Sequence, residues 1–335
     1  MRNKKLRWQL PVLLLFIIAT VFIVRKQTPY QENEGKIFGT IYHATYQYPE
    51  NLQKEIEAEL KKVDNSLSPF NQASIISRIN RNEDVTPDSL FTEVIGCSEK
   101  ISQETNGAFD ITIAPLANVW GFGFKKGAFP DSVTVDSLLE ITGYEKIKLE
   151  NGKFIKSDPR IMISCSAVAK GYGSDVVARY FDRKGIQNYM IEIGGEVVVK
   201  GNNPQKTPWH IGISKPVDDS LSVNQELQTV LKITNVGMAT SGNYRNFYYK
   251  DGKKYAHTID PKTGYPVQHS LLSATVIAPD CMSADAYATS FMVMGLEKSE
   301  AFAEANPSID AFFIYEDENG KTQTWFTSGM KKYIE

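Results

Sequence analysis

Cysteine and histidine are scarce in this chain, with three cysteines and four histidines among 335 residues. Cys97, Cys165 and Cys281 lie far apart, and none has the short spacing of paired metal-binding cysteines. This excludes the common structural zinc modules. Three cysteines allow at most one disulfide, and buried free thiols are the interpretation that we favour.

Familiar nucleotide-binding loops are missing as well. Gly121, Gly123 and Gly127 do not have the spacing of the dinucleotide-binding glycine motif, and no predicted strand precedes them. Lys170-Gly171 reverses the order of the phosphate-binding P-loop and lacks its partner glycine. There is no internal repeat and no low-complexity tract. A bound phosphate would therefore be held in another way.

Positive charge is also in short supply beyond the N-terminus. The first 26 residues contain six of the 37 lysines and arginines and none of the 39 acidic residues. The remainder has 31 cations against 39 acids, a formal net charge of about −8. A nucleic-acid partner would require a basic surface, so this balance argues against one.

A long apolar run occurs once, at the N-terminus. Four cations among the first seven residues precede the run at 8–24, and Arg25 and Lys26 close it. This pattern predicts a signal anchor or a signal peptide over residues 1–26, with a cytoplasmic N-terminus. We favour an uncleaved anchor because no small-x-small cleavage site follows, although a cleaved signal remains open. We expect a tether over 27–35 and a single domain over 36–335.

The remaining pattern predicts clustered helices and mostly consecutive strands. Such an order favours an α+β fold with mixed or mainly antiparallel sheets over a repeating βαβ chain. The predicted helices cover 51–63, 73–80, 90–105, 133–141, 167–184, 283–294 and 298–305. The predicted strands cover 37–48, 146–149, 154–156, 160–164, 189–193, 196–200, 210–213, 229–233, 246–249, 254–258, 271–277, 311–315 and 322–326.

Short polar signatures are distributed along most of the chain. Glycines, carboxylates and hydroxyls build cores poorly, and their placement indicates one polar pocket assembled from many loops. In order they are Phe38-Gly39-Thr40, Gly107-Ala108-Phe109-Asp110-Ile111-Thr112, Ala169-Lys170-Gly171-Tyr172, Gly194-Gly195, Ser241-Gly242-Asn243-Tyr244-Arg245, His257-Thr258-Ile259-Asp260-Pro261 with Gly264, and Ala284-Asp285-Ala286 with Ala288-Thr289.

This ordered set resembles the FAD:protein FMN transferases, the ApbE-like family, over residues 36–330. The resemblance implies one T-fold-related catalytic domain that transfers FMN from the substrate FAD to a Thr or Ser hydroxyl of an acceptor protein and releases AMP. It also implies that the acceptors are flavin-bearing subunits of membrane redox complexes or extracytoplasmic reductases. Together with the N-terminal segment, it predicts a periplasmic domain at the inner membrane.

Asp285 and Thr289 lie four residues apart on a predicted helix and therefore share a face. Oxygen ligands of this kind suit Mg²⁺, whereas an ordinary helix with an acidic first turn and Ser283 as its N-cap is the alternative. The resemblance implies a magnesium site made of Asp285, Thr289 and the backbone carbonyl of Ala167.

Amides at the start of the 167–184 helix, together with Lys170, could attract a phosphate. The resemblance also implies a flavin site from many segments, and Ser164 stands where family members often carry an acid. The implied cofactor-binding residues are Phe38, Phe70, Ala108, Phe109, Asp110, Ser164, Lys170, Gly194, Gly195, Tyr244 and His257.

A lone histidine is more often a structural hydrogen bonder, but the motif around His257 resembles that of the family, which makes His257 the candidate catalytic residue. A base with a pKa near neutral is suited to deprotonate a hydroxyl nucleophile. Asp260 could orient His257, but we favour a role in the turn closed by Pro261 and Gly264. Two other functions remain open: an FAD pyrophosphatase that uses water as acceptor, and a non-catalytic flavin-binding protein.

Overall fold

The computed structural model describes residues 9, 11–16, 28–125, 129–217, 226–244 and 246–334. Most of the predicted N-terminal anchor or signal, Gly127 and Arg245 lie outside these ranges. Within the described residues, no helix has the length and apolar character needed to span a bilayer.

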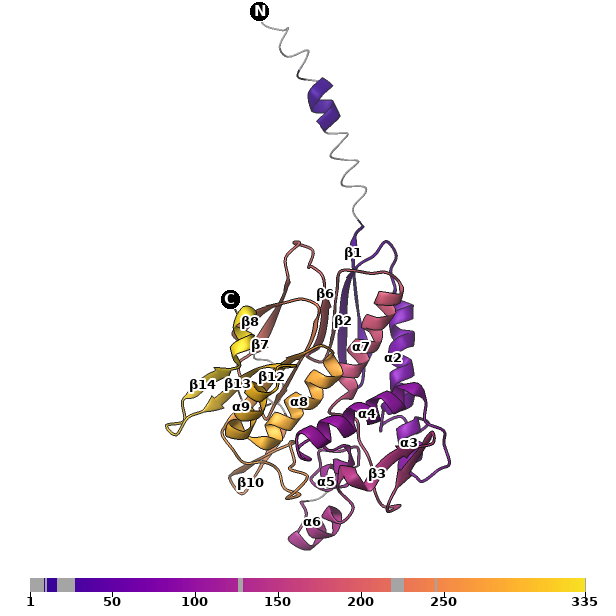
Figure 1. Cartoon of the computed structure of the whole chain (residues 1–335), viewed down its shortest axis with the longest axis vertical. Helices are drawn as coiled ribbons and strands as arrows, with labels where there is room; N and C mark the ends of the chain where they lie inside the picture. Colours follow the sequence, from indigo (N-terminus) through magenta and orange to yellow (C-terminus); the bar gives the residue numbers. More distant parts are fainter. Residues whose placement is uncertain are drawn as a thin grey trace, which may run out of the picture.

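An eight-stranded sheet forms the centre of the molecule (Figure 1), and every pair of neighbouring strands in it is antiparallel. The predicted α+β fold with mainly antiparallel strands is thus confirmed. In spatial order the strands are β1 (Tyr30–Ile37), β2 (Thr40–Gln47), β5 (Tyr189–Ile193), β6 (Glu196–Lys200), β9 (Val236–Gly242), β12 (Leu271–Ala278), β13 (Asp310–Glu316) and β14 (Thr322–Phe326).

The predicted tether over 27–35 is wrong for residues 30–35, which belong to β1. β1 pairs with β2 through a tight turn at Phe38 and Gly39, where both residues have positive φ. β1 lies at the edge of the sheet and pairs on one side only. An edge strand tolerates polar and charged residues, and because β1 is rich in them, its sequence did not predict a strand.

Strand β9 was not predicted, although it occupies an interior position between β6 and β12. It contains Gly237, Gly242 and other small residues instead of the bulky residues that favour strands. A Cβ atom on Gly237 would lie 2.3 Å from the backbone nitrogen of Cys281. The small residues therefore serve the close approach of β9 to the next helix.

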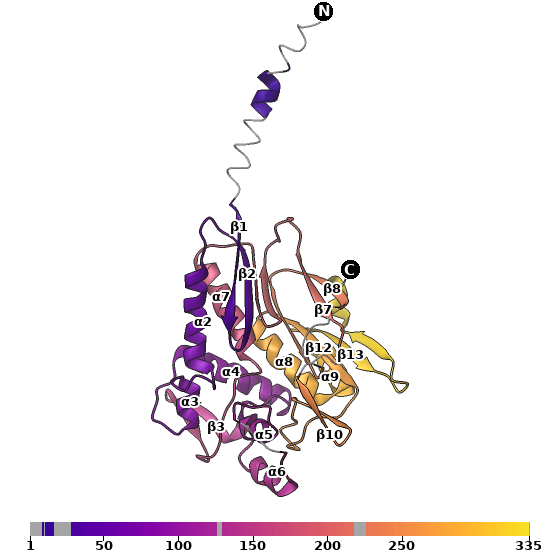
Figure 2. The same ribbon diagram turned by 180° about the vertical axis from the view of Figure 1, so that it is seen from behind.

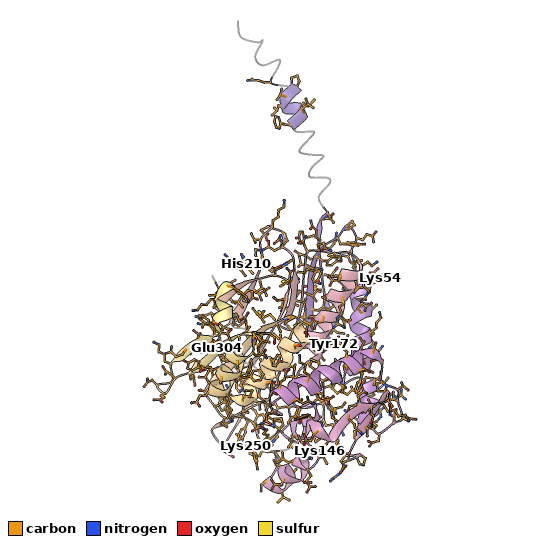
Figure 3. All side chains as sticks on the ribbon, in the orientation of Figure 1. Lys54, Lys146, Tyr172, His210, Lys250 and Glu304 are labelled. Carbon is orange, nitrogen blue, oxygen red and sulfur yellow. The ribbon has the colours of Figure 1, made fainter. Side chains whose placement is uncertain are left out.

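Helices cover one face of this sheet and a two-stranded hairpin covers the other (Figures 1 and 2). The helices are α2 (Gln53–Leu67), α4 (Ser89–Glu104), α7 (Ala169–Arg183), α8 (Cys281–Met294) and α9 (Leu296–Ala305). The hairpin consists of β7 (Trp209–Ser214) and β8 (Leu227–Ile233). Figure 3 shows Tyr172 of α7 in the middle of the molecule, and its hydroxyl donates a 2.6 Å hydrogen bond to Glu93 of α4.

Shorter elements gather below the helices in Figure 1. They are α3 (Ile75–Asn80), the 3-10 turns η1 (Ile111–Ile113) and η2 (Tyr144–Lys146), α5 (Ala114–Val119), α6 (Ser132–Leu139), and the hairpins β3 (Ile147–Glu150) with β4 (Lys153–Lys156) and β10 (Phe247–Lys250) with β11 (Lys253–Ala256). The chain ends in the turn η3 (Ser328–Lys332).

Residues 160–164 do not form the predicted strand. Ile161 and Ile163 are buried, which explains the strand-like alternation. However, the backbone groups of Ile163 bond to the side chain of Asn80, at 2.8 and 2.9 Å, instead of to another strand. Ser164 donates its N–H to the carbonyl of Ile111 at 2.8 Å. Side-chain partners thus replace the ladder that the alternation suggested.

Helix α8 begins at Cys281, earlier than predicted, and Ser283 is not its N-cap. Asp280 is the cap, and its carboxylate accepts the N–H of Ser283 at 2.8 Å. Asp175 of α7 accepts two further N–H groups, from Cys281 at 2.9 Å and Met282 at 2.8 Å. A helix start has N–H groups without internal partners, so this carboxylate fastens α8 to α7.

The thiols of all three cysteines are free. Cys165 and Cys281 are buried and Cys97 is partly buried, and burial raises the pKa of each thiol. The prediction of buried free thiols is therefore confirmed for Cys165 and Cys281.

Val135 of α6 provides a direct test of core packing. It is fully buried, and a Cβ on Gly264 would come within 2.5 Å of its side chain. We expect Val135→Ala to lower the free energy of unfolding by about 2 kcal/mol, measured by urea denaturation, because two buried methyl groups are lost. Val133 on the same helix is 74% exposed, so Val133→Ala should change it by less than about 0.5 kcal/mol. Equal effects of the two substitutions would contradict the described packing.

Asp175 should make stability depend on pH. Burial raises its pKa from 3.8 to about 7, so the folded protein holds this proton more tightly than the unfolded chain. The bound proton stabilises the folded protein fully at a pH below the pKa that Asp175 has in the unfolded chain. As pH rises toward the pKa in the folded protein, this stabilisation is lost, and the free energy of unfolding falls by at most about 1.4 kcal/mol per pH unit. Asp175→Asn removes the titration. Urea denaturation of both proteins between about pH 4 and pH 8 tests this, and parallel pH profiles would show the assignment to be wrong.

Candidate functional site

The start of α7 lies directly against α8. Gly171 donates its backbone N–H to Oδ2 of Asp285 at 3.1 Å. A Cβ on Gly171 would lie 2.4 Å from the carbonyl oxygen of Cys281 and 3.0 Å from the Cβ of Asp285. Only glycine allows this approach. The predicted metal-binding carboxylate and the predicted phosphate-binding helix start are therefore adjacent.

Thr289 lies one helical turn after Asp285, as predicted, and is half-buried. Its hydroxyl oxygen is 3.3 Å from that of Ser241 near the end of β9. Ala167 lies in the turn that leads into α7, where the N–H groups of the two following residues bond to the carbonyl of Cys165. Asp285, Thr289 and Ala167 thus come from two adjacent helix segments.

Lys170 and Glu196 form an ion pair beside Asp285. The ammonium of Lys170 donates to Oε1 of Glu196 at 2.5 Å, and the side chains are 30% and 3% exposed. Burial lowers the pKa of Lys170, but the carboxylates of Glu196 and Asp285 outweigh burial and hold this pKa above its ordinary value. Burial also raises the pKa of Glu196, although Lys170 opposes this shift.

Asp285 is 3% exposed, and burial raises its pKa to about 8, with a further contribution from the carboxylate of Glu196. A buried carboxylate with such a pKa is stabilised in its charged form by a nearby cation. A carboxylate, a hydroxyl and a backbone carbonyl are hard oxygen donors, which Mg²⁺ prefers. The residues present therefore fit a magnesium ion. Among the described residues, no group of three His, Cys, Asp or Glu side chains is arranged to hold a metal.

Two hairpin turns lie next to the start of α7. Gly194 and Gly195 have positive φ and connect β5 to β6, and Gly194 donates its N–H to Ile41 at 3.1 Å. The ring of Phe38 lies against Gly173 of α7, where a Cβ would come within 2.8 Å. The structure therefore brings Phe38, Gly194 and Gly195 to the same helix as Lys170.

The segment with Ala108, Phe109 and Asp110 is buried between the helices. Asp110 caps η1 and accepts the N–H and the hydroxyl of Thr112, at 2.8 and 2.6 Å. Burial raises the pKa of Asp110. The ring of Phe109 is 2% exposed and belongs to the main core cluster. Ser164 is joined to this segment through its bond to Ile111.

His257 is half-buried. Its Nδ1 lies 3.2 Å from the carbonyl oxygen of Asn246, and its backbone N–H donates to the same oxygen at 3.0 Å. Burial lowers the pKa of His257, and the charge of Lys170 lowers it further. His257 thus lies within the electrostatic reach of Lys170, which also interacts with Asp285.

The motif around His257 is tied to the loop after β9. Thr258 donates its hydroxyl to Asn243 at 2.7 Å, next to the buried Tyr244. Asp260 accepts the N–H of Lys262 through its side chain at 2.9 Å and that of Gly264 through its carbonyl at 2.8 Å. The preferred interpretation of Asp260 as a turn residue agrees with these bonds.

Phe70 is different from the other predicted residues because its side chain is 71% exposed. Its ring meets that of Phe124 edge-on, with centroids 6.5 Å apart.

A cavity of about 400 Å³ also opens apart from the predicted residues, beside the start of β12. It is lined by Pro216, Asn243, Lys254, Ala256, Val267, Gln268, His269, Leu271, Leu272 and Glu316.

Sequence analysis missed an aromatic stack next to His257. Trp120, Tyr255, Tyr248 and Phe122 follow one another with centroid distances of 5.9, 5.7 and 5.1 Å and planes within 21° of parallel. The ring of Phe122 meets His257 at 6.5 Å. The stack fastens the β10–β11 hairpin to the loop after α5. No sequence spacing could reveal it, because its rings come from two distant segments.

Glu196 was also missed. Its signal was an acidic residue between Gly194-Gly195 and three valines, where a polar side chain is unexpected.

Residues 38–313 match the ApbE family. The chain is 40% identical to the FAD:protein FMN transferase of Vibrio cholerae, over 90% of this chain and 91% of that protein, and 37% identical to that of Haemophilus influenzae, over 93% of each. It is similar to the solved flavin transferase ApbE from Vibrio cholerae, with a TM-score of 0.82 and 35% identity over 91% of this chain and all of that one. It is also similar to the flavinyl transferase ApbE from Pseudomonas stutzeri, with a TM-score of 0.81 and 30% identity over 91% of this chain and 97% of that one. The resemblance seen in the ordered signatures is confirmed, and this chain belongs to the ApbE family of flavin transferases.

Proposed function

We propose that this protein transfers FMN from FAD to a Thr or Ser hydroxyl of an acceptor protein, with release of AMP, in a magnesium-dependent reaction. One observation carries the proposal: Gly171, next to Lys170 at the start of α7, donates its backbone N–H to the buried Asp285 at 3.1 Å, and the charge of Lys170 also lowers the pKa of His257. The names of the relatives given above support the same reaction.

Asp285, Thr289 and the carbonyl of Ala167 would hold Mg²⁺. When bound, this ion would neutralise charge on the diphosphate oxygens of FAD. Lys170 and the backbone amides that open α7 would hold the same diphosphate, because cations and the start of a helix attract anions. The other predicted residues would form or support the remainder of the flavin-nucleotide site: Phe38, Phe70, Ala108, Phe109, Asp110, Ser164, Gly194, Gly195 and Tyr244.

His257 would accept the proton of the attacking hydroxyl. The carbonyl of Asn246 can only accept a hydrogen bond, so the proton of the neutral ring lies on Nδ1. Nε2 is then the proton acceptor. Because the pKa of His257 is lowered, the ring is neutral at physiological pH and ready to act as a base.

We also propose that residues 1–26 anchor the protein in the inner membrane and that the catalytic domain is periplasmic. The charge pattern of the sequence supports this orientation. The acceptors would then be extracytoplasmic reductases or flavin-bearing subunits of membrane redox complexes.

The transfer is tested by mass spectrometry of a threonine-containing acceptor after incubation with FAD and Mg²⁺. The acceptor should gain the mass of FMN, and chelation should prevent the gain. Asp285→Ala should lower the rate by at least about 10²-fold, because the main ligand of the ion is lost. Asp182→Ala, an exposed site on α7, is the control. Free FMN and AMP formed without acceptor would indicate a pyrophosphatase, and tight FAD binding without AMP release would indicate a binding protein.

His257→Asn should lower kcat by about 10²- to 10⁴-fold while FAD still binds, because general-base assistance is lost. In the unchanged protein, the rate should fall with decreasing pH only below the ordinary titration range of histidine, because burial lowers the pKa at which His257 takes up a proton. Steady-state kinetics across this range measure both effects. His43→Asn, on the exposed side of β2, is the matched control, and equal losses in the two variants would refute the role of His257.

A further inference from the structure

Glu196 is an unusual residue for the position it occupies. It is the first residue of β6, directly after the Gly194–Gly195 turn, and is 3% exposed. Oε1 accepts from Lys170, but Oε2 is buried without a hydrogen-bond partner among the described residues. Burial of a carboxylate with an unpaired oxygen is costly, and such groups concentrate at functional sites.

The backbone holds Glu196 in place. β6 pairs with β5 through Ile193 and Glu196, and the carbonyl of Glu196 accepts the hydroxyl of Ser174 at 3.1 Å. The side chain therefore meets Lys170 from a fixed direction.

Lys170 has two possible carboxylate partners. The charge of Asp285 raises the pKa of Lys170. Within the described part of the chain, however, Lys170 forms an ion pair shorter than 4.0 Å with Glu196 and none with Asp285. An ammonium directly on Asp285 would occupy the oxygen atoms that a divalent cation requires. The two acids thus divide two roles between them.

We propose that Glu196 is a positioning residue that holds the ammonium of Lys170 away from Asp285 and so keeps the Asp285 carboxylate available to a divalent cation. This inference rests on the metal site of the proposed function. It assigns Glu196 no contact with the ion or with FAD.

The test is direct binding of Mn²⁺, as a probe for Mg²⁺, measured by electron paramagnetic resonance on the full chain without FAD or acceptor. Glu196→Gln retains the shape of the side chain but removes its charge. It should weaken Mn²⁺ binding by about tenfold, because Lys170 is released toward Asp285. Glu93→Gln, which breaks the ion pair of α7 with α4 at Arg179, is the matched control and should leave the affinity unchanged.

A double-mutant cycle separates positioning from a simple loss of negative charge. With Lys170→Met present, Glu196→Gln should change Mn²⁺ affinity by less than about twofold, because no ammonium remains to compete. A weakening of similar size in both backgrounds overturns the inference. Lys170→Met alone should bind Mn²⁺ at least as tightly as the unchanged protein. Loss of binding in that variant overturns it even if Glu196→Gln does not fold.

These outcomes are distinct from failure of the proposed function. A protein that shows the Mn²⁺ pattern but transfers no FMN refutes the reaction and supports the role of Glu196. A protein that transfers FMN but binds Mn²⁺ equally well after Glu196→Gln refutes the role of Glu196 alone.

Discussion

The close contact between the start of α7 and the start of α8 is the constraint on which the site depends. Gly171 of α7 and Gly237 of β9 allow both elements to pack closely against α8, since a Cβ on either residue would collide with the backbone near Cys281. Asp175 and Asp285 then bind across the contact through backbone N–H groups. The same packing that fastens the helices therefore also buries the carboxylate proposed to bind the ion.

This burial has an electrostatic consequence. The charges of Glu196 and Asp175 both act on Asp285, and Lys170 is a cation whose charge acts on Asp285 and Glu196. Burial favours the protonated form of each acid and thus costs free energy when the acids are charged. A divalent cation would relieve this imbalance, which links the stability of the region to the metal of the proposed reaction.

Much of the fold could be predicted because its long elements have clear periodicity. Strands β5, β6 and β14 have the predicted bounds, and the long helices lie where expected. The failures have physical causes: β1 is a polar edge strand, β9 is built of small residues that admit α8, and residues 160–164 bond to the side chain of Asn80. In each case the position of the segment in the folded protein, and not its local hydrophobic pattern, determined its structure.

By itself the sequence determined the family and the α+β class, because the order of the polar signatures and the hydrophobic periodicity are properties of the chain alone. It also indicated Asp285, Thr289 and His257. Only the tertiary structure decided that Glu196 faces Lys170, that Asp175 and Asp280 cap α8, and that an aromatic stack ends at His257. These partners are distant along the chain or depend on where a helix starts, and burial rather than spacing sets their charge and their neighbours.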